Sequence, residues 1–399
     1  MNDSKSLSII IPAYNEENAI ADIIQRCLKE RENIKRETPI NKVEIIVVND
    51  GSRDSTAKIA GQFHEISLIS YAKNRGYGAA IKTGFAQATG DFVGFLDADG
   101  TCDPNYFVPL CNTLINDEAD IVIGSRMTPE SKMPALRKVG NLFFAMLINL
   151  LGNTKITDSA SGMRVIRKDS LPKIYPLPDG LHFTPAMSCK AVLDGDIKIL
   201  EVPMSYEERI GESKLGVVHD GVRFLKTIVD IALTYEPFKF FSSIGILFFL
   251  VGLLYGIYPL VYYMRFSLVP DYMIYRLITV TVLIVSSLTL FTVGIISDET
   301  AGLLNKRRHG RSIFRTVMYS MLSQKKLIIV GIAAPCIGVV INYKTIGEYI
   351  TTGLIYVPWV YVVTGAFFVL VGLQSLALGI LRRILALLKE SRERGVGNH

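Results

Sequence analysis

Two short acidic loops contain the residues best suited to chemistry. Residues 49–52, Asn-Asp-Gly-Ser, follow an apolar run at 43–48, and residues 97–100, Asp-Ala-Asp-Gly, follow another at 92–96. Two carboxylates one residue apart, in a tight turn that ends in glycine, can present oxygen atoms to a hard cation that also binds phosphates. The second loop therefore indicates a cation site.

Buried strands must position these loops. Each preceding run is short, apolar and bounded by turn residues, which is typical of a strand in a mostly parallel sheet. Open α/β sheets bind ligands at the carboxyl ends of such strands, so the pattern predicts a nucleotide-sugar site there. The alternation of segments predicts a doubly wound α/β sheet, with strands at 7–13, 43–48, 66–71, 92–96 and 120–124 and helices near 16–32, 55–63 and 79–88.

The second part of the chain is predicted to be a membrane domain. The 399 residues are 49% hydrophobic with a mean hydropathy of +0.32, which is too apolar for one soluble domain, and the excess follows residue 239. We expect a domain at 1–235 and a membrane domain of four transmembrane helices at 236–399. Runs near the ~20 residues needed to cross a bilayer lie at about 240–263, 274–297, 327–343 and 354–381.

Charge placement predicts how the chain meets the membrane. Basic residues concentrate in the connection 305–315 and after the fourth run, so by the positive-inside rule the first domain and the C-terminus are cytoplasmic in a multi-pass protein of the cell membrane. Segments 134–151 and 217–236 combine an apolar face with cationic flanks, as interfacial helices do. Ordinary core-facing amphipathic helices are the alternative for these two segments.

Composition disfavours several other classes. The net charge is +6, but the basic residues lie near apolar segments and do not form a basic face interleaved with stacking aromatic residues, so a membrane surface is favoured over nucleic acid. The five cysteines have no metal-ligand spacing and are expected to be reduced, buried thiols. The polar N-terminus leads directly into a strand, so no signal peptide is expected.

Seven motifs, in order, resemble those of the family 2 glycosyltransferases of the GT-A fold. The last three are similar to the polyprenyl-phosphate branch, the enzymes like dolichol-phosphate mannose synthase, and the resemblance covers about residues 7–235. The motifs are 12–16 (Pro-Ala-Tyr-Asn-Glu), 47–52 (Val-Val-Asn-Asp-Gly-Ser), 74–78 (Asn-Arg-Gly-Tyr-Gly), 97–100, 124–126 (Gly-Ser-Arg), 161–164 (Ser-Gly-Met-Arg) and 208–214 (Glu-Arg-Ile-Gly-Glu-Ser-Lys).

The resemblance implies which residues bind the donor. It makes Asp99 the direct ligand of Mg²⁺ or Mn²⁺ and Asp97 its partner in the metal site or a ribose contact. A divalent ion there would neutralise the charge that develops on the leaving diphosphate. Many relatives have Gln two residues after the second Asp, whereas this chain has Thr101, so that additional ligand is in doubt. The implied nucleotide-sugar contacts are Pro12, Tyr14, Glu16, Asp50, Asp97 and Lys214.

A lipid phosphate needs fixed cations, and arginine binds phosphate through two hydrogen bonds. Arg126 and Arg209 match the acceptor-phosphate positions of the branch, and Arg209 is grouped with Asp97 and Asp99 as catalytic. Arg137 either joins them or anchors an interfacial helix to lipid head groups. Ser161 is a further acceptor-site candidate, although a Ser-Gly turn can be purely structural.

These residues together predict inverting transfer of one hexose, from GDP-mannose or UDP-glucose, to dolichyl or undecaprenyl phosphate at the cytoplasmic membrane face. The acceptor phosphate, with a second pKa near ~6, is already mostly ionised, so no strong general base is required and Asp158 is expected to orient other groups. Homo-oligomerisation through the membrane helices stays open.

The sequence disfavours two alternative functions. A processive polysaccharide synthase should have a Gln-x-x-Arg-Trp motif after the acidic loops, but the one tryptophan is Trp359, in the fourth apolar run. A non-catalytic glycolipid carrier should have ionisable residues within its spans, and these runs contain few.

Overall fold

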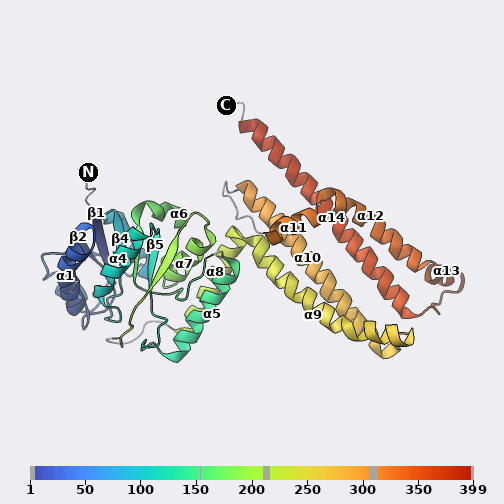
Figure 1. The fold of residues 1–399 in the computed structure, drawn as a ribbon, viewed down its shortest axis with the longest axis horizontal. Coiled ribbons are helices and arrows are strands. Elements are labelled where there is room, and N and C mark those ends of the chain that lie inside the picture. The colour runs from blue at the N-terminus through green and yellow to red at the C-terminus, as the bar shows by residue number, and fades with distance from the viewer. Residues whose placement is uncertain (1–4, 153, 210–215, 305–312, 397–399) are drawn as a thin grey trace. The chain divides into compact units, whose positions relative to one another are not determined.

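The computed structural model describes residues 5–152, 154–209, 216–304 and 313–396. The chain divides into two compact units, Met1–Tyr235 and Glu236–His399. The first unit is built on a β-sheet, and the second is helical (Figure 1).

In the described part of the first unit, the sheet has seven strands in the order β3-β2-β1-β4-β6-β5-β7. Strands β3, β2, β1 and β4 pair in parallel, as do β5 and β7, while β6 runs antiparallel between β4 and β5. The sheet is therefore mostly parallel with one reversed strand, as in a GT-A fold. The strands are β1 Lys5–Ala13, β2 Ile40–Asn49, β3 Ser67–Ser70, β4 Phe92–Phe95, β5 Ile121–Ser125, β6 Arg164–Arg167 and β7 Ile199–Pro203.

The strand register brings the predicted loops together. Ala13 at the end of β1 pairs with Asn49 at the end of β2, and Ile10 of β1 pairs with Phe95 of β4. Because these strands are parallel, the residues that follow each of them emerge at one edge of the sheet. Both acidic loops therefore lie at that edge, beside the turn after β1.

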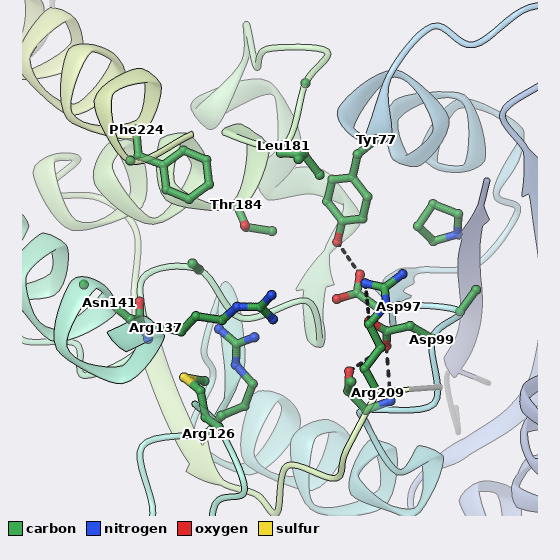
Figure 2. A pocket seen from close by; sticks show the side chains of 18 of the residues that line it. Tyr77, Asp97, Asp99, Arg126, Arg137, Asn141, Leu181, Thr184, Arg209 and Phe224 are labelled. Atoms are coloured by element: carbon green, nitrogen blue, oxygen red, sulfur yellow. Dashed lines mark hydrogen bonds and ion pairs between the residues drawn. The ribbon is translucent and has the colours of Figure 1, made fainter. Parts of the chain in front are cut away.

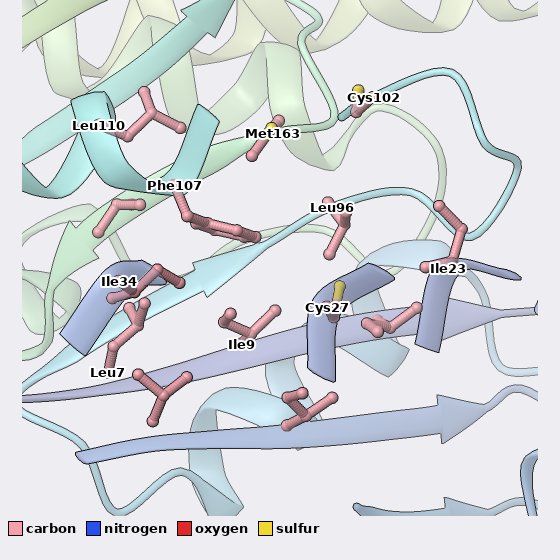
Figure 3. Close-up of a cluster of buried hydrophobic side chains, with 14 of the residues drawn as sticks. Leu7, Ile9, Ile23, Cys27, Ile34, Leu96, Cys102, Phe107, Leu110 and Met163 are labelled. Atoms are coloured by element: carbon pink, nitrogen blue, oxygen red, sulfur yellow. The ribbon is translucent and has the colours of Figure 1, made fainter. Parts of the chain in front are cut away.

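Helices cover both faces of this sheet. Helix α1 (Ile20–Glu37) places buried residues three or four apart against the sheet, and α4 (Phe107–Asn116) completes the same core, where Ile9, Cys27 and Phe107 meet (Figure 3). The remaining helices of the unit are α2 (Thr56–Ala60), α3 (Tyr77–Gln87), α5 (Ala135–Leu151), α6 (Leu171–Ile174), α7 (Phe183–Leu193) and α8 (Val217–Tyr235), with short 3₁₀ turns at Pro104–Tyr106 and Lys168–Ser170.

The five predicted strands and three predicted helices are present, with shifted ends. Helix α1 begins at Ile20 rather than near residue 16, because residues 14–19 form a turn in which Asn15 has φ 51° and the Glu16 carbonyl accepts from the N–H of Ile20. Strands β6 and β7 were not predicted. Both are short, and β6 runs antiparallel to β4 and β5, so it does not continue the βαβ pattern.

Among its described residues, the second unit contains four helices that are long and apolar enough to cross a membrane, at Pro237–Phe266, Asp271–Leu303, Gln324–Ile341 and Trp359–Ser391. They extend beyond the predicted runs at most ends. Two shorter helices, α11 and α13, lie where only connections were expected. The elements are α9 Pro237–Phe266, a 3₁₀ turn Asp271–Met273, α10 Ile274–Leu304, α11 Ile313–Met321, α12 Gln324–Ile341, α13 Tyr343–Thr352 and α14 Trp359–Val396.

Candidate functional site

A cavity of about 790 Å³ lies in the first unit, over the edge of the sheet where the acidic loops emerge (Figure 2). One part is charged and the other, between α5 and α8, is apolar. Nine predicted site residues line it: Pro12, Tyr14, Glu16, Asp50, Asp97, Asp99, Arg126, Arg137 and Arg209. Lys214 lies outside the described residues.

Asp97 is held by Tyr77 at the base of the cavity. The hydroxyl of Tyr77, the first residue of α3, donates to Asp97 Oδ1 at 2.7 Å. Burial raises the pKa of the Asp97 carboxyl to about 7, and the charge of Asp99 adds to this shift. Two carboxylates that repel each other in a buried site favour a shared cation, because the cation offsets both charges.

Asp99 is oriented by its own loop. The hydroxyl and the N–H of Thr101 both donate to Asp99 Oδ1, at 2.6 and 3.1 Å. Thr101 therefore orients this carboxylate. The other oxygen, Oδ2, lies 3.1 Å from Nη1 of Arg209, whose Nη2 donates to Glu16 Oε1 at 2.6 Å.

Asp50 organises the loop before α3. Its two carboxylate oxygens accept from the N–H groups of Arg75 and Gly76, at 2.7 and 2.9 Å, and burial raises its pKa. Gly51, next in sequence, has φ +71°, and a Cβ there would lie 2.5 Å from the backbone of Lys73. The Asp-Gly pair thus both lines the predicted nucleoside pocket and shapes one of its walls.

A buried anion fixes Arg126. Asp158 is fully buried and accepts from Nε and Nη2 of Arg126, both at 2.8 Å, and from the amide of Asn141 on α5 at 2.8 Å. Burial alone would raise the pKa of Asp158, but the Arg126 guanidinium holds it below its usual value. Asp158 thereby orients the arginine, in agreement with the orienting role predicted for it.

Arg137 points into the cavity on the side of the acid pair, and Arg126, whose guanidinium faces Asp158, also lines the cavity (Figure 2). Helix α5 presents Leu136 and Val139, each 66% exposed, along the apolar wall, and Phe224 of α8 lies on the same cavity. Large apolar side chains exposed beside cationic groups suit a ligand that is anionic at one end and oily at the other.

Ser161 does not line the cavity. It is fully buried and its hydroxyl donates to the Gly124 carbonyl at 2.6 Å, which is the structural alternative for this Ser-Gly turn. Arg164, also fully buried, donates to the carbonyls of Ser159 and Ser161 at 3.0 and 3.2 Å. These contacts fix the segment 158–162 between Arg126 and Asp97.

Sequence reasoning missed Tyr77, Asn141 and Gly162 as contributors to the site. Tyr77 lies within the Asn-Arg-Gly-Tyr-Gly motif, so its place between two glycines was an available signal. Asn141 had no such signal, because its role depends on the packing of α5 against the segment that contains Asp158. The role of Gly162 is likewise visible only in three dimensions.

Gly162 lies against Asp97 so closely that a Cβ there would be 1.9 Å from Asp97 Oδ2. We therefore expect Gly162→Ala to displace that carboxylate and to lower turnover by about 10²-fold, since a shift of about 1 Å in a reactive site has that effect. Steady-state kinetics on purified protein would measure it. Gly195→Ala is the matched control, because nothing lies within 4 Å of its Cβ position. Equal activity of the two variants would contradict the prediction.

The raised pKa of Asp97 predicts that replacing this carboxyl group by an amide stabilises the folded protein, and that this gain in stability depends on pH. Between its ordinary pKa of 3.8 and about 7, the folded protein retains a proton that the unfolded chain releases, so the stability of the wild type falls as pH rises through this window. The amide of Asp97→Asn does not ionise, so the variant does not lose stability in this pH window. In chelator-treated protein we expect its Tm to exceed that of the wild type by about 4 °C or more at pH 8 and to differ little at pH 4.5. A gain that is equal at both pH values would contradict the assigned cause.

Comparison with known proteins agrees with this geometry. The family described as "Glycosyl transferase family 2" matches residues 8–175, and a domain of unknown function matches residues 237–396. A dolichyl-phosphate hexose transferase of Haloferax volcanii is 31% identical over 228 residues, which are 57% of this chain and 94% of that protein.

Two further relatives match less of their own length. The low-salt glycan biosynthesis hexosyltransferase Agl6 of Haloferax volcanii is 30% identical over 62% of this chain and 58% of that protein. The dolichyl-phosphate beta-glucosyltransferase ALG5C of Trichomonas vaginalis is 33% identical over 53% of this chain and 66% of that protein. The chain thus spans less than two thirds of these two relatives.

The mostly parallel sheet with its acidic loop at the carboxyl edge defines a GT-A fold. The chain belongs to glycosyltransferase family 2. The expected resemblance to the polyprenyl-phosphate branch is confirmed, because the relatives include enzymes named for dolichyl phosphate.

Proposed function

We propose that this protein transfers one hexose, with inversion, from a nucleoside diphosphate sugar to a polyprenyl phosphate at the cytoplasmic face of a membrane. One observation supports this most strongly: a single cavity joins an acid pair, four arginines and an apolar wall. This arrangement provides for a diphosphate with its cation, for an anionic acceptor, and for the oily chain attached to that acceptor.

The donor end of the cavity suits a divalent cation. Within the described parts of the chain, no group of three or more His, Cys, Asp or Glu side chains gathers as a metal site. The protein thus offers Asp97 and Asp99, and the like-charge repulsion between them fits a cation that takes its other ligands from water and phosphate oxygens. When bound, Mg²⁺ or Mn²⁺ would offset charge on the leaving diphosphate. Pro12, Tyr14, Glu16 and Asp50 would then face the nucleoside.

The acceptor end relies on guanidinium groups. Arg126, whose position is fixed by Asp158, and Arg137 would bind the lipid phosphate, and Arg209 lies against the acid pair, with its Nη1 3.1 Å from Asp99 Oδ2 (Figure 2). The exposed apolar residues of α5 and α8 would contact the first part of the lipid chain, at the depth expected for interfacial helices.

The chemical step requires that the two substrates be accurately positioned, but it requires no strong general base. The phosphate oxygen attacks the anomeric carbon as the bond to the diphosphate breaks. Because the second pKa of the acceptor phosphate is ~6, most of it is already deprotonated near neutral pH. The arginines reduce the repulsion between two anions and hold the nucleophile in line. Asp158 contributes by fixing Arg126, since both of its oxygens already accept hydrogen bonds.

The four apolar helices support the assignment of a multi-pass membrane protein. The proposed cytoplasmic location of the first unit depends on the basic residues of the connection 305–315 and of the C-terminal end. Most of that connection lies outside the described residues. Cysteine labelling of intact cells, at single cysteines introduced into the two weakly charged connections, would test the orientation.

Lipid extraction provides the direct test of activity. Membranes that contain the protein are incubated with labelled GDP-mannose or UDP-glucose and with dolichyl or undecaprenyl phosphate. We expect one of these pairs to give a labelled, acid-labile lipid that contains a single sugar, and we expect EDTA to abolish it. No labelled lipid with any pair would overturn the proposed function, and a product insensitive to EDTA would overturn the role of the acid pair.

A further inference from the structure

The first helical hairpin of the second unit carries an arginine stacked on aromatic rings. Helices α9 and α10 pack against each other, and residues 267–273 connect them at what we call the distal end of the hairpin (Figure 1). Arg276, in the first turn of α10, places its guanidinium 4.7 Å from the ring centroids of both Tyr255 and Tyr258 on α9. Two aromatic rings therefore hold this cation in one place.

The distal end is remote from the point where the chain enters the hairpin. The 30 residues of α9, at about 1.5 Å each, make a helix about 45 Å long that begins at Pro237. The hydrocarbon core of a bilayer is about 30 Å thick. When α9 spans a bilayer, Arg276 therefore lies at the leaflet opposite Pro237. It does not line the cavity of the first unit.

No counter-ion of Arg276 lies among the described residues. Over that part of the chain, its guanidinium forms no ion pair and donates no hydrogen bond, and its polar contacts are the two rings. Asp271 is the one acidic residue within 255–276, and its Oδ1 accepts from Nε1 of Trp359 on α14 at 2.8 Å. An arginine in an apolar helix, stacked on rings but not neutralised, indicates a site for an anion.

The surroundings favour the phosphate of a lipid as that anion. Ring contacts engage the face of a guanidinium, whereas phosphate oxygens accept from its N–H edge, so one arginine can make both contacts at once. Leu254 of α9 and Ile278 of α10 are exposed beside the stacked residues in sequence, and they provide apolar surface for a lipid chain. Tyr272 and Tyr275, also exposed, are typical of the membrane interface, where head groups lie.

We propose that Arg276, with Tyr255 and Tyr258, binds the phosphate head group of a membrane lipid in the leaflet opposite Pro237. The chains of that lipid would lie along α9 and α10. The site is separate from the acceptor site of the first unit and does not depend on the proposed transfer of a hexose. An arginine that only snorkels to head groups keeps its rotamer freedom and selects by charge alone, whereas a stacked guanidinium is already oriented for phosphate.

The one tryptophan of the chain provides a local reporter, because Trp359 donates to Asp271 at the distal end. The full-length protein in dodecyl maltoside is titrated with brominated phosphatidic acid, whose bromine atoms quench nearby tryptophan fluorescence. Brominated diacylglycerol, with the same chains and no phosphate, is the control ligand. We expect half-maximal quenching at a concentration at least about tenfold lower for phosphatidic acid, as charge-assisted hydrogen bonds to a phosphate provide.

Three variants separate the stacked arginine from general electrostatics. Arg276→Gln should remove most of the preference for phosphatidic acid. Arg265→Gln removes the same charge from an exposed position in the last turn of α9, and it should keep the preference within about twofold. Tyr255→Leu retains the charge but removes one ring, so it should lower the preference about threefold.

Each outcome supports or overturns the proposal. Equal quenching of the wild type by the two lipids would overturn it, and so would an equal loss in Arg276→Gln and Arg265→Gln, since charge alone would then explain the preference. Displacement of phosphatidic acid by millimolar inorganic phosphate would overturn the assignment to a lipid. The wild-type comparison decides the matter even if a variant fails to fold. None of these measurements involves sugar transfer, so a failure here leaves the proposed function in place.

Discussion

Asp99→Asn is expected to lower hexose transfer by about 10³-fold while leaving the protein folded and inserted in the membrane. The substitution keeps the shape of the side chain but removes the charge that would hold the cation, and a loss of about 4 kcal/mol of transition-state stabilisation corresponds to that factor. Asp99 emerges from the loop after β4 and is 8% exposed, so the change is confined to the cavity.

Transfer rates and nucleotide binding should be measured on the same preparations. Asp103→Asn is a matched control, since Asp103 lies four residues further on, caps the turn at Pro104–Tyr106 and pairs with Arg26 outside the cavity. It should retain turnover within about twofold, as surface changes usually do. A normal rate for Asp99→Asn would show that the acid pair has no part in catalysis.

Asp158→Ala is expected to cause the largest loss of stability among the site substitutions, about 3–5 kcal/mol of unfolding free energy. Asp158 is fully buried and accepts from the Arg126 backbone and guanidinium, from Asn141 and from the Ala160 N–H. Its removal leaves a charged guanidinium, only 12% exposed, without its counter-ion.

A double-mutant comparison identifies the cause of this loss. Arg126→Ala made in the Asp158→Ala background removes the unpaired charge, so it should restore part of the lost unfolding free energy, whereas it should be destabilising in the wild type. Chemical unfolding in detergent would measure all four proteins. If the losses of unfolding free energy in the two single variants simply add in the double variant, the Arg126–Asp158 ion pair is not the cause of the destabilisation. The packing of α5 would then explain it.

The location of the site could be predicted from sequence because it depends on local features. Apolar runs that end in Asp-Gly turns indicate strands whose carboxyl ends carry the chemistry, and the parallel register of β1, β2 and β4 then leaves little freedom in where those loops lie. The membrane helices were equally predictable, since length and hydropathy are sufficient for a span.

Several predicted residues nevertheless have partners that sequence did not indicate. Glu16, which lines the cavity, also accepts from Arg209, which lies 193 residues further along the chain. Ser161 was expected at the acceptor phosphate, yet it is buried against Gly124. Hydrogen bonds between distant segments depend on how loops and helices pack, and no local pattern reports them.

The amino-acid sequence by itself thus determined the class of fold, the edge of the sheet at which ligands bind, and the presence of spans, because strand period, turn chemistry and hydropathy are local properties. The tertiary structure alone decided which carboxylate faces which cation. Asp158 holds Arg126, Tyr77 holds Asp97, and Asp99 shares Arg209 with Glu16. Those pairings arise only when loops from separate strands meet in one buried space, where a charge left without ion-pair or hydrogen-bond partners is costly.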